Sequence, residues 1–138
     1  MDYHETVMTS LADDQGENRS AAEGVLRDTA ARLRELLTQL AASLRPFPAF
    51  LNMTTLQAVE LEPPFGVLED RGCVVVAPDG NICQLELKMV PGAPGVRETD
   101  QIEEFLELDL PAGDYILYAA TAIGLLTQEL RRRETGRP

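Results

Sequence analysis

Thiols and imidazoles, the side chains most often used for nucleophilic catalysis and zinc binding, are few in this chain: two cysteines and a single histidine. A metal centre or a Cys–His pair needs thiols and imidazoles at ligand spacing, and His4 has no cysteine at such a distance along the chain. A Ser-His-Asp site is not expected either, because this histidine lies in a terminal stretch expected to be frayed and no serine lies in a nucleophile elbow. We therefore expect no catalytic residue, no metal ligand, no cofactor-binding residue and no cofactor.

The two cysteines lie in the two strands of a predicted β-hairpin, one on each side of its turn. A two-residue turn at Asp79-Gly80 places Cys73 opposite Glu86, and the two thiols then lie on opposite faces of the hairpin. With a three-residue turn, Cys73 is still several residues along the strand from the partner of Cys83, beyond the roughly 7 Å that a disulfide spans between Cα atoms. We expect two free, buried thiols, and a redox sensor or metal ligand is the alternative.

Carboxylates are the one plentiful reactive group. Residues 98–114 hold seven of them and no basic residue, so we call this stretch the acidic segment. On a short helix Glu103, Glu104 and Glu107 would crowd one side, where they could bind a divalent cation or transfer protons, but the segment lacks the Asp/Asn alternation and central glycine of a calcium loop. We expect a solvated face, with an acidic docking patch for a basic partner as the alternative.

The overall charge excludes two classes of partner. Asp and Glu total 23 against 12 Lys and Arg, which gives a net charge of -11 and repels phosphate backbones and anionic membranes. The basic run 131–133 ends a predicted helix, where it offsets the helix dipole. The start of the chain lacks a secretory signal, and the apolar stretch 115–127 is shorter than the roughly 20 residues of a membrane span. We expect a cytoplasmic protein that binds neither nucleic acid nor membrane.

A long helix is predicted from the capping box Ser20-Ala21-Ala22-Glu23 to Arg45, because Pro46 disfavours an α conformation at the residue before it. Apolar residues follow in four-three spacing at Leu26, Ala30, Leu33, Leu37, Leu40 and Leu44. Residues 1–19 show no lasting period and are expected to form a flexible acidic arm. The chain is thus divided into this arm and a single domain, 20–135.

Strands are predicted at 56–62, 72–77 and 82–90. The second strand is apolar on both faces, which indicates a central strand covered on each side, whereas the third alternates between apolar and polar residues. The acidic segment fits either helical or strand spacing, and we favour a short helix followed by a new helix from Asp114. Residues 115–133 repeat the four-three spacing of a helix, and a strand over 115–121 is the alternative.

These elements predict an α+β domain with a long N-terminal helix, a three- to four-stranded antiparallel sheet, and a C-terminal helix packed on one face. The leading functional hypothesis is a non-enzymatic protein-interaction or adaptor domain, possibly a homodimer, acting through the acidic segment and a leucine stripe: Leu33, Leu37, Leu40 and Leu44. Packing of the stripe inside its own chain is an equal alternative. The alternative function is a small-ligand binding domain with a pocket between sheet and C-terminal helix, near Tyr115 and Tyr118.

Overall fold

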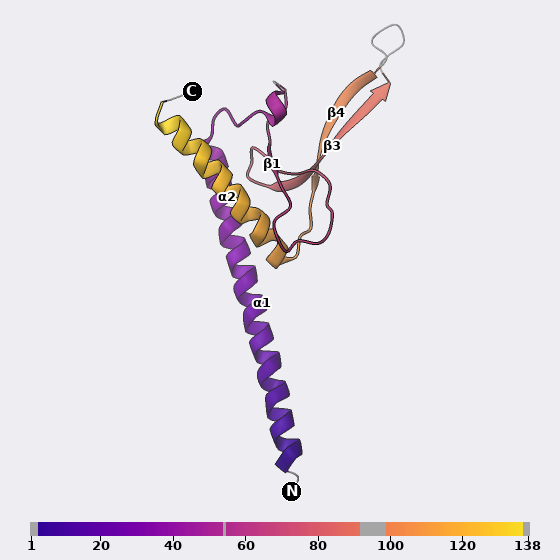
Figure 1. Cartoon of the computed structure of the whole chain (residues 1–138), viewed down its shortest axis with the longest axis vertical. Helices are drawn as coiled ribbons and strands as arrows, with labels where there is room; N and C mark the ends of the chain where they lie inside the picture. Colours follow the sequence, from indigo (N-terminus) through magenta and orange to yellow (C-terminus); the bar gives the residue numbers. More distant parts are fainter. Residues whose placement is uncertain (1–2, 54, 92–98, 137–138) are drawn as a thin grey trace.

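The computed structural model describes residues 3–53, 55–91 and 99–136, and it confirms the predicted α+β fold. The chain forms two long helices, one at each end, with a four-stranded sheet between them in the sequence (Figure 1). The elements are α1 (Tyr3–Ser43), the 3₁₀ turn η1 (Phe50–Asn52), β1 (Val59–Leu61), β2 (Val74–Val76), β3 (Ile82–Pro91), β4 (Thr99–Glu107) and α2 (Ala112–Glu134).

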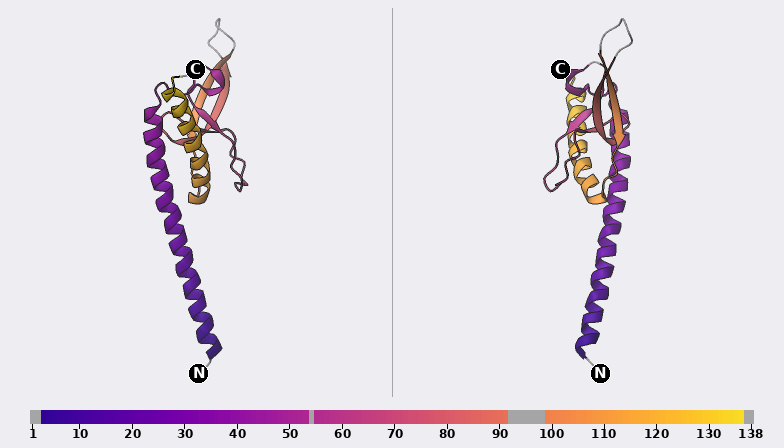
Figure 2. Two further views of the ribbon diagram at one scale, coloured as in Figure 1. Left: turned by 60° about the vertical axis from the view of Figure 1, so that its left-hand side comes forward. Right: turned by 90° about the vertical axis from the view of Figure 1, so that its right-hand side faces the viewer.

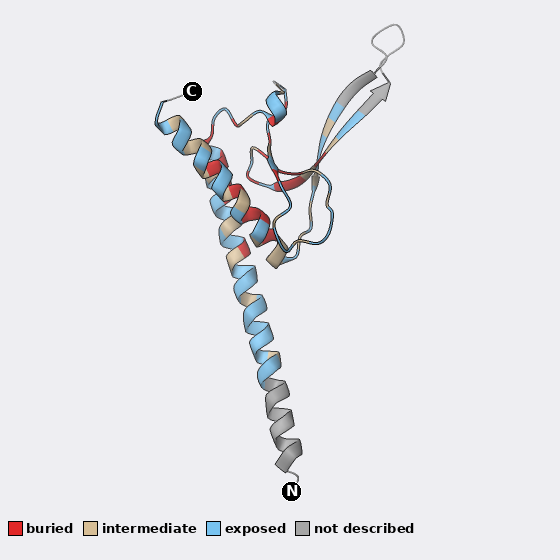
Figure 3. Ribbon diagram, viewed as in Figure 1, coloured by how far each residue is buried: buried red, intermediate tan, exposed pale blue. Residues whose placement is uncertain are grey.

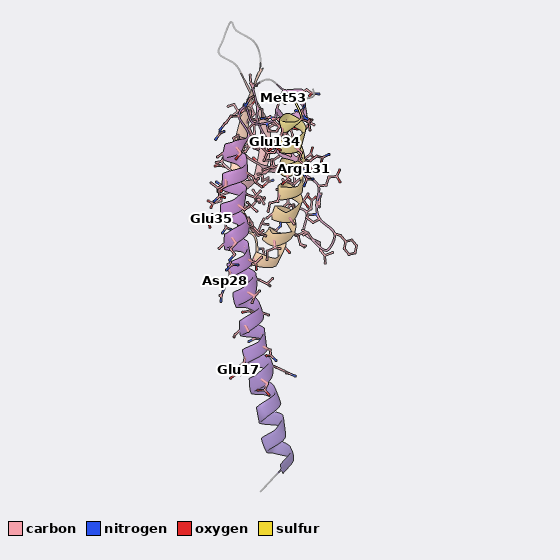
Figure 4. The ribbon with its side chains drawn as sticks, turned by 90° about the vertical axis from the view of Figure 1, so that its left-hand side faces the viewer. Glu17, Asp28, Glu35, Met53, Arg131 and Glu134 are labelled. Atoms are coloured by element: carbon pink, nitrogen blue, oxygen red, sulfur yellow. The ribbon has the colours of Figure 1, made fainter. Side chains whose placement is uncertain are left out.

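The two helices lie side by side and run in the same direction, and only the C-terminal half of α1 packs against α2 (Figures 1 and 2). The N-terminal half of α1 projects away from the rest of the molecule. Ala30 is the first buried residue of α1 among the side chains that the structure describes (Figure 3). Glu17 and Asp28, both exposed, lie on the projecting part (Figure 4).

The helix start predicted at Ser20 is wrong, because α1 begins at Tyr3 and continues through the capping-box sequence. A capping box begins a helix only where its first residue lies outside the α conformation. No proline precedes Ser20, and residues such as Glu17, Ala21 and Ala22 favour a helix, so nothing in the sequence breaks it there. The division of the chain at residue 19 stays a prediction.

The sheet is an antiparallel meander in the order β1-β2-β3-β4. One face packs on the helix pair, where Val74 and Val76 join the main core with Leu37 of α1 and Tyr118 of α2. On the other face Val75 packs in a smaller cluster with Phe50, Leu56, Ala58 and Leu85. All three valines of β2 are buried, which confirms the predicted central strand with cover on both sides.

The short helix expected in the acidic segment is wrong, because residues 99–107 form β4 and pair with β3 along nine positions. In a helix Asp100 would lie beside Glu104, and Glu103 beside Glu107, since residues four apart are neighbours there and like charges repel. In a strand, successive side chains point to opposite faces, so the same carboxylates are spread over two surfaces. Pairing with β3 thus overrides the helical spacing.

The predicted C-terminal helix is confirmed over 115–133, although α2 already begins at Ala112. Its last turn carries Arg131, Arg132 and Arg133, the cations that suit a helix C-terminus. Glu129 accepts hydrogen bonds from Arg132 and Arg133, and these bonds, that of Arg132 above all, lower the pKa of the Glu129 carboxyl to about 2. Two of the three arginines are therefore paired within the helix.

Candidate functional site

The hairpin between β2 and β3 turns over three residues, Pro78 to Gly80, because the Ala77 amide donates to the Asn81 carbonyl at 2.9 Å. The two-residue turn and its register are therefore wrong. Val75 pairs with Cys83, and the amide of Leu85 donates to the carbonyl of Cys73 at 2.8 Å, so the two thiols lie on the same face.

Both cysteines are free thiols. Burial raises the pKa of the Cys73 thiol, with a further contribution from Glu60. Burial also raises the pKa of the Cys83 thiol, and Asp79 and Glu107 add to the effect. Because the thiolate is the nucleophile, these surroundings suppress the reactivity of both side chains.

The leucine stripe lies against the core of its own chain. Leu37 and Leu44 are each 0 % exposed, and Leu33 and Leu40 are partly buried against the same cluster. Their neighbours in that cluster include Tyr118, Ala119, Ala122 and Leu126 of α2. The structure thus has the internal packing that the sequence left as an equal alternative.

A pocket of about 740 Å³ opens where the acidic segment leaves the sheet. Its walls come from the C-terminal half of α1, the β2–β3 turn with the start of β3, the end of β4 with the residues after it, and the first turn of α2. The charged and aromatic residues that line it are Arg34, Asp79, Phe105, Glu107, Asp109 and Tyr115, and Asn81 adds a polar amide. We call this hollow the acidic pocket.

The charges around the acidic pocket are unbalanced. Three carboxylates, those of Asp79, Glu107 and Asp109, face one guanidinium, that of Arg34. The Arg34 guanidinium carbon lies 4.5 Å from the centre of the Tyr115 ring, a cation–π contact, and no described carboxylate lies within 4.0 Å of it. The lining therefore carries a net negative charge and attracts cations.

Tyr115 is the residue of the pocket with an unfilled hydrogen-bonding capacity. Only 6 % of the residue is exposed, and its hydroxyl is buried without a hydrogen-bond partner. Burial raises the pKa of Tyr115, against an opposing effect of Arg34, so the hydroxyl stays protonated. A buried polar group without a partner costs about 1–3 kcal/mol, which a bound group could recover. Tyr118, 1 % exposed, lies in the core and does not line the pocket.

The acidic segment continues from the pocket along β4. Glu104, Glu107 and Asp109 are exposed there. The chain's single lysine, Lys88 of β3, lies between two of the glutamates: its ammonium is 3.2 Å from a Glu104 oxygen and 3.4 Å from a Glu86 oxygen. These bonds raise the pKa of Lys88, that with Glu104 most. The Glu104 carboxylate of β4 thus already binds one cation, the Lys88 ammonium.

Sequence reasoning singled out the acidic segment and Tyr115 separately, and the structure brings the two together. It missed Arg34 and Asp79, which reach the pocket from distant parts of the chain. Arg34 immediately follows Leu33 of the apolar stripe, which places it at the margin of the buried face. No spacing rule in the sequence links it to Tyr115.

Within the described ranges no cluster of three or more His, Cys, Asp or Glu side chains is arranged to hold a metal ion. Neither α1 nor α2, over the residues described, has the length and apolar character needed to cross a membrane. Comparisons with protein-family models, with curated proteins and with solved structures find no match to this chain.

Proposed function

We propose that this chain is a non-enzymatic protein-interaction domain that binds a basic segment of a partner protein through its acidic segment and acidic pocket. The observation that carries the proposal is the buried, unpartnered hydroxyl of Tyr115, a residue that lines a pocket with three carboxylates and one guanidinium. Such a pocket offers a cationic side chain both charge and a hydrogen-bonding group. The two free thiols of the chain fit a reducing compartment, and we propose that the protein is located in the cytoplasm.

Electrostatics support a basic partner in two ways. The net charge of -11 attracts cationic proteins over a distance, which speeds their encounter. At short range, Glu107 and Asp109 can each form a charge-assisted hydrogen bond with an arginine, which is stronger than a bond between neutral groups. Phe105 beside them supplies an aromatic surface against which a guanidinium can stack.

The proposal places the partner away from the leucine stripe. Leu37 and Leu44 are already fully buried in a single chain, so a homodimer through them would require α1 to separate from α2. The acidic segment, in contrast, is accessible without any rearrangement of the core. Of the two contact surfaces considered from the sequence, we therefore propose the acidic one.

The double variant Glu107→Gln/Asp109→Asn is expected to bind a basic peptide about tenfold more weakly, because it removes two charge-assisted contacts and keeps the side-chain shapes. The probe is a fluorescently labelled peptide of three arginines and three valines. Its dissociation constant is measured by fluorescence anisotropy at low and at physiological salt, since screening weakens exposed charge pairs.

The matched control is Glu60→Gln/Glu62→Gln, which changes the net charge equally at the opposite edge of the sheet, where both glutamates are exposed. This control should bind almost as tightly as the wild type. Equal weakening by the two double variants would show attraction by net charge alone and would contradict a defined site. A wild-type chain that does not bind the peptide would refute the proposed function.

A second candidate is a domain that binds a small ligand, and the same unpartnered hydroxyl favours it. The pocket combines apolar walls at Phe105, Leu108 and Leu110 with polar groups that converge on it. A small amine with an apolar body would fit this lining: the amine near Glu107 or Asp109, and a hydrogen-bonding group at Tyr115. The two candidates differ in whether the ligand extends beyond the pocket along β4.

The variant Tyr115→Phe tests two effects of the buried hydroxyl separately: its effect on the stability of the free protein and its contribution to binding. In the free protein the variant should raise the free energy of unfolding by about 1 kcal/mol, because it removes a buried group without a partner and keeps the ring under Arg34. Binding of the peptide, or of a small amine, should weaken. Urea unfolding followed by circular dichroism measures the first effect, and calorimetric titration measures the second.

Tyr118→Phe is the control, since its hydroxyl is not among the buried groups without a partner and its removal should bring no gain. A Tyr115→Phe variant that is less stable than the wild type by 1 kcal/mol or more would mean that the hydroxyl is bonded inside the free protein. It would then have no spare capacity for a ligand, and the central observation of both candidates would be lost.

A further inference from the structure

We infer that the basic segment of the partner binds as an added strand along the open edge of β4, antiparallel to it. The inference rests on the proposed function and adds the geometry of the complex. β4 is the last strand of the sheet and pairs with β3 only. Among the described residues, no backbone hydrogen bond from elsewhere in the chain reaches its outer edge.

The direction of the backbone groups of β4 follows from the registers. The Leu85 amide donates to Cys73 on the β2 side, and in an antiparallel sheet the N–H and C=O of one residue point the same way. Leu85 therefore turns its backbone groups away from Phe105, its partner in β4. Phe105 and, two residues to either side, Glu103 and Glu107 consequently point their N–H and C=O groups to the open edge.

The same three residues share one face of β4, because side chains two apart in a strand lie on one side. Phe105 is 40 % exposed, and Leu87 of β3, opposite Glu103, is 43 % exposed on that face. An added strand would meet a carboxylate, an aromatic ring and a carboxylate in turn. The added strand is complementary if its residues opposite Glu107, Phe105 and Glu103 are basic, apolar and basic, in that order.

The opposite face sets the remaining positions of the partner strand. Ile102, 47 % exposed, Glu104 and Leu106 lie there in sequence. An antiparallel strand opposite residues 107 to 102 is therefore complementary when it reads basic, apolar, apolar, basic, basic, apolar. The peptide Arg-Val-Val-Arg-Arg-Val has this order.

A second copy of the chain does not suit this edge. Two β4 strands paired antiparallel about Phe105 would place Glu103 of one copy opposite Glu107 of the other, twice over. Like charges directly opposite destabilise a strand pair, and charged residues on an edge are a common defence against self-association. The edge is thus closed to copies of itself and complementary to a cationic strand.

The pocket lies at the end of this edge. Glu107 belongs to both, as the last residue of β4 and a lining residue of the acidic pocket. A strand added along β4 brings its first basic side chain to Glu107, next to Asp109. The guanidinium of an arginine there lies at the pocket whose lining includes Tyr115.

The test compares three forms of Arg-Val-Val-Arg-Arg-Val against the full chain by fluorescence anisotropy. Methylation of the backbone nitrogens of its third and fifth residues removes donors that would face β4, opposite Phe105 and Glu103. We expect about tenfold weaker binding, as the loss of two hydrogen bonds implies. Methylation at the second and fourth residues, which would face solvent, should leave the affinity within about twofold of the unmodified peptide.

All three peptides carry the same charge, so the outcomes separate the two proposals. If the unmodified peptide binds and both methylated forms bind equally well, strand addition is overturned and the acidic site stands. If the unmodified peptide does not bind, the proposed function fails. Light scattering on the free chain tests the remaining occupant, a second copy, with Phe65 of the loop between β1 and β2 as an exposed control residue. A dimer that Phe105→Lys disperses and Phe65→Lys does not would assign the edge to a second copy and overturn the inference.

Discussion

Replacing Gly80 with alanine is expected to lower the free energy of unfolding by about 2–5 kcal/mol, through backbone strain and a steric clash combined. Gly80 is a buried residue of the β2–β3 turn with a φ of +88°. A Cβ atom there would lie 2.7 Å from the Leu37 carbonyl oxygen and 2.8 Å from the Thr38 Cα atom, both backbone atoms of α1. Neither can move without displacing the helix.

The control for this variant is Gly124→Ala, which should have the opposite sign. Gly124 lies in α2, is exposed, and has no atom within 4 Å of an added Cβ. Alanine should therefore raise the free energy of unfolding by about 0.5–1 kcal/mol through its higher helix propensity. Urea midpoints report both effects. A Gly80→Ala midpoint equal to that of the wild type would show that the turn does not touch α1.

Leu37→Glu is expected to leave the chain largely unfolded. The substitution removes a leucine that is 0 % exposed and puts an unpaired carboxylate in the main core. Its cost of about 4 kcal/mol or more is most of the stability of a domain at the low end of the ordinary range of about 5–15 kcal/mol. Far-ultraviolet circular dichroism and thermal unfolding measure the loss.

Leu36→Glu is the matched control, because the neighbouring leucine is 40 % exposed on α1 and a glutamate there keeps contact with water. It should change the free energy of unfolding by less than about 1 kcal/mol. If Leu37→Glu instead gave a folded monomer from a dimeric wild type, the stripe would belong to an interface between copies. The burial of Leu37 and Leu44 in one chain predicts unfolding.

The sequence predicted those elements whose periodicity agrees with their surroundings. The four-three spacing around Leu37 and the alternation from Cys83 to Met89 correctly indicated a helix and a strand. β4 was missed because Ile102, Phe105 and Leu106 also fit a helix, and the choice depends on the open edge of β3. Such pairing is a tertiary effect that no local pattern contains.

The hairpin register was missed for a similar reason. Asp79 and Gly80 suit a two-residue turn, but the structure includes Pro78 in a three-residue turn, which shifts the partner of Cys83 from Val76 to Val75. A shift of one residue moves a side chain to the other face, so the relation between the two thiols changed with it. In this longer turn Gly80 lies against the α1 backbone at Leu37 and Thr38.

Only the acidic part of the candidate site could be predicted from the sequence. Seven carboxylates in residues 98–114 are visible in the sequence, and an acidic docking patch was one of the interpretations they allowed. The pocket was not predictable, because Arg34 and Asp79 reach Tyr115 only through the packing of α1, the β2–β3 turn and α2. That the Tyr115 hydroxyl lacks a partner is a property of this packing alone.

The contact between α1 and α2 also sets an order of events while the chain is being made. Leu37 cannot contact Ala119 of α2 until about 80 more residues have been synthesised. At 5–20 residues per second this takes about 4–16 s. The hairpins β2–β3 and β3–β4 join neighbours in sequence and can form during that interval. The contacts of the leucine stripe with α2 are therefore the last of the main core to form, whereas its contacts with Val74 and Val76 of β2 can form earlier.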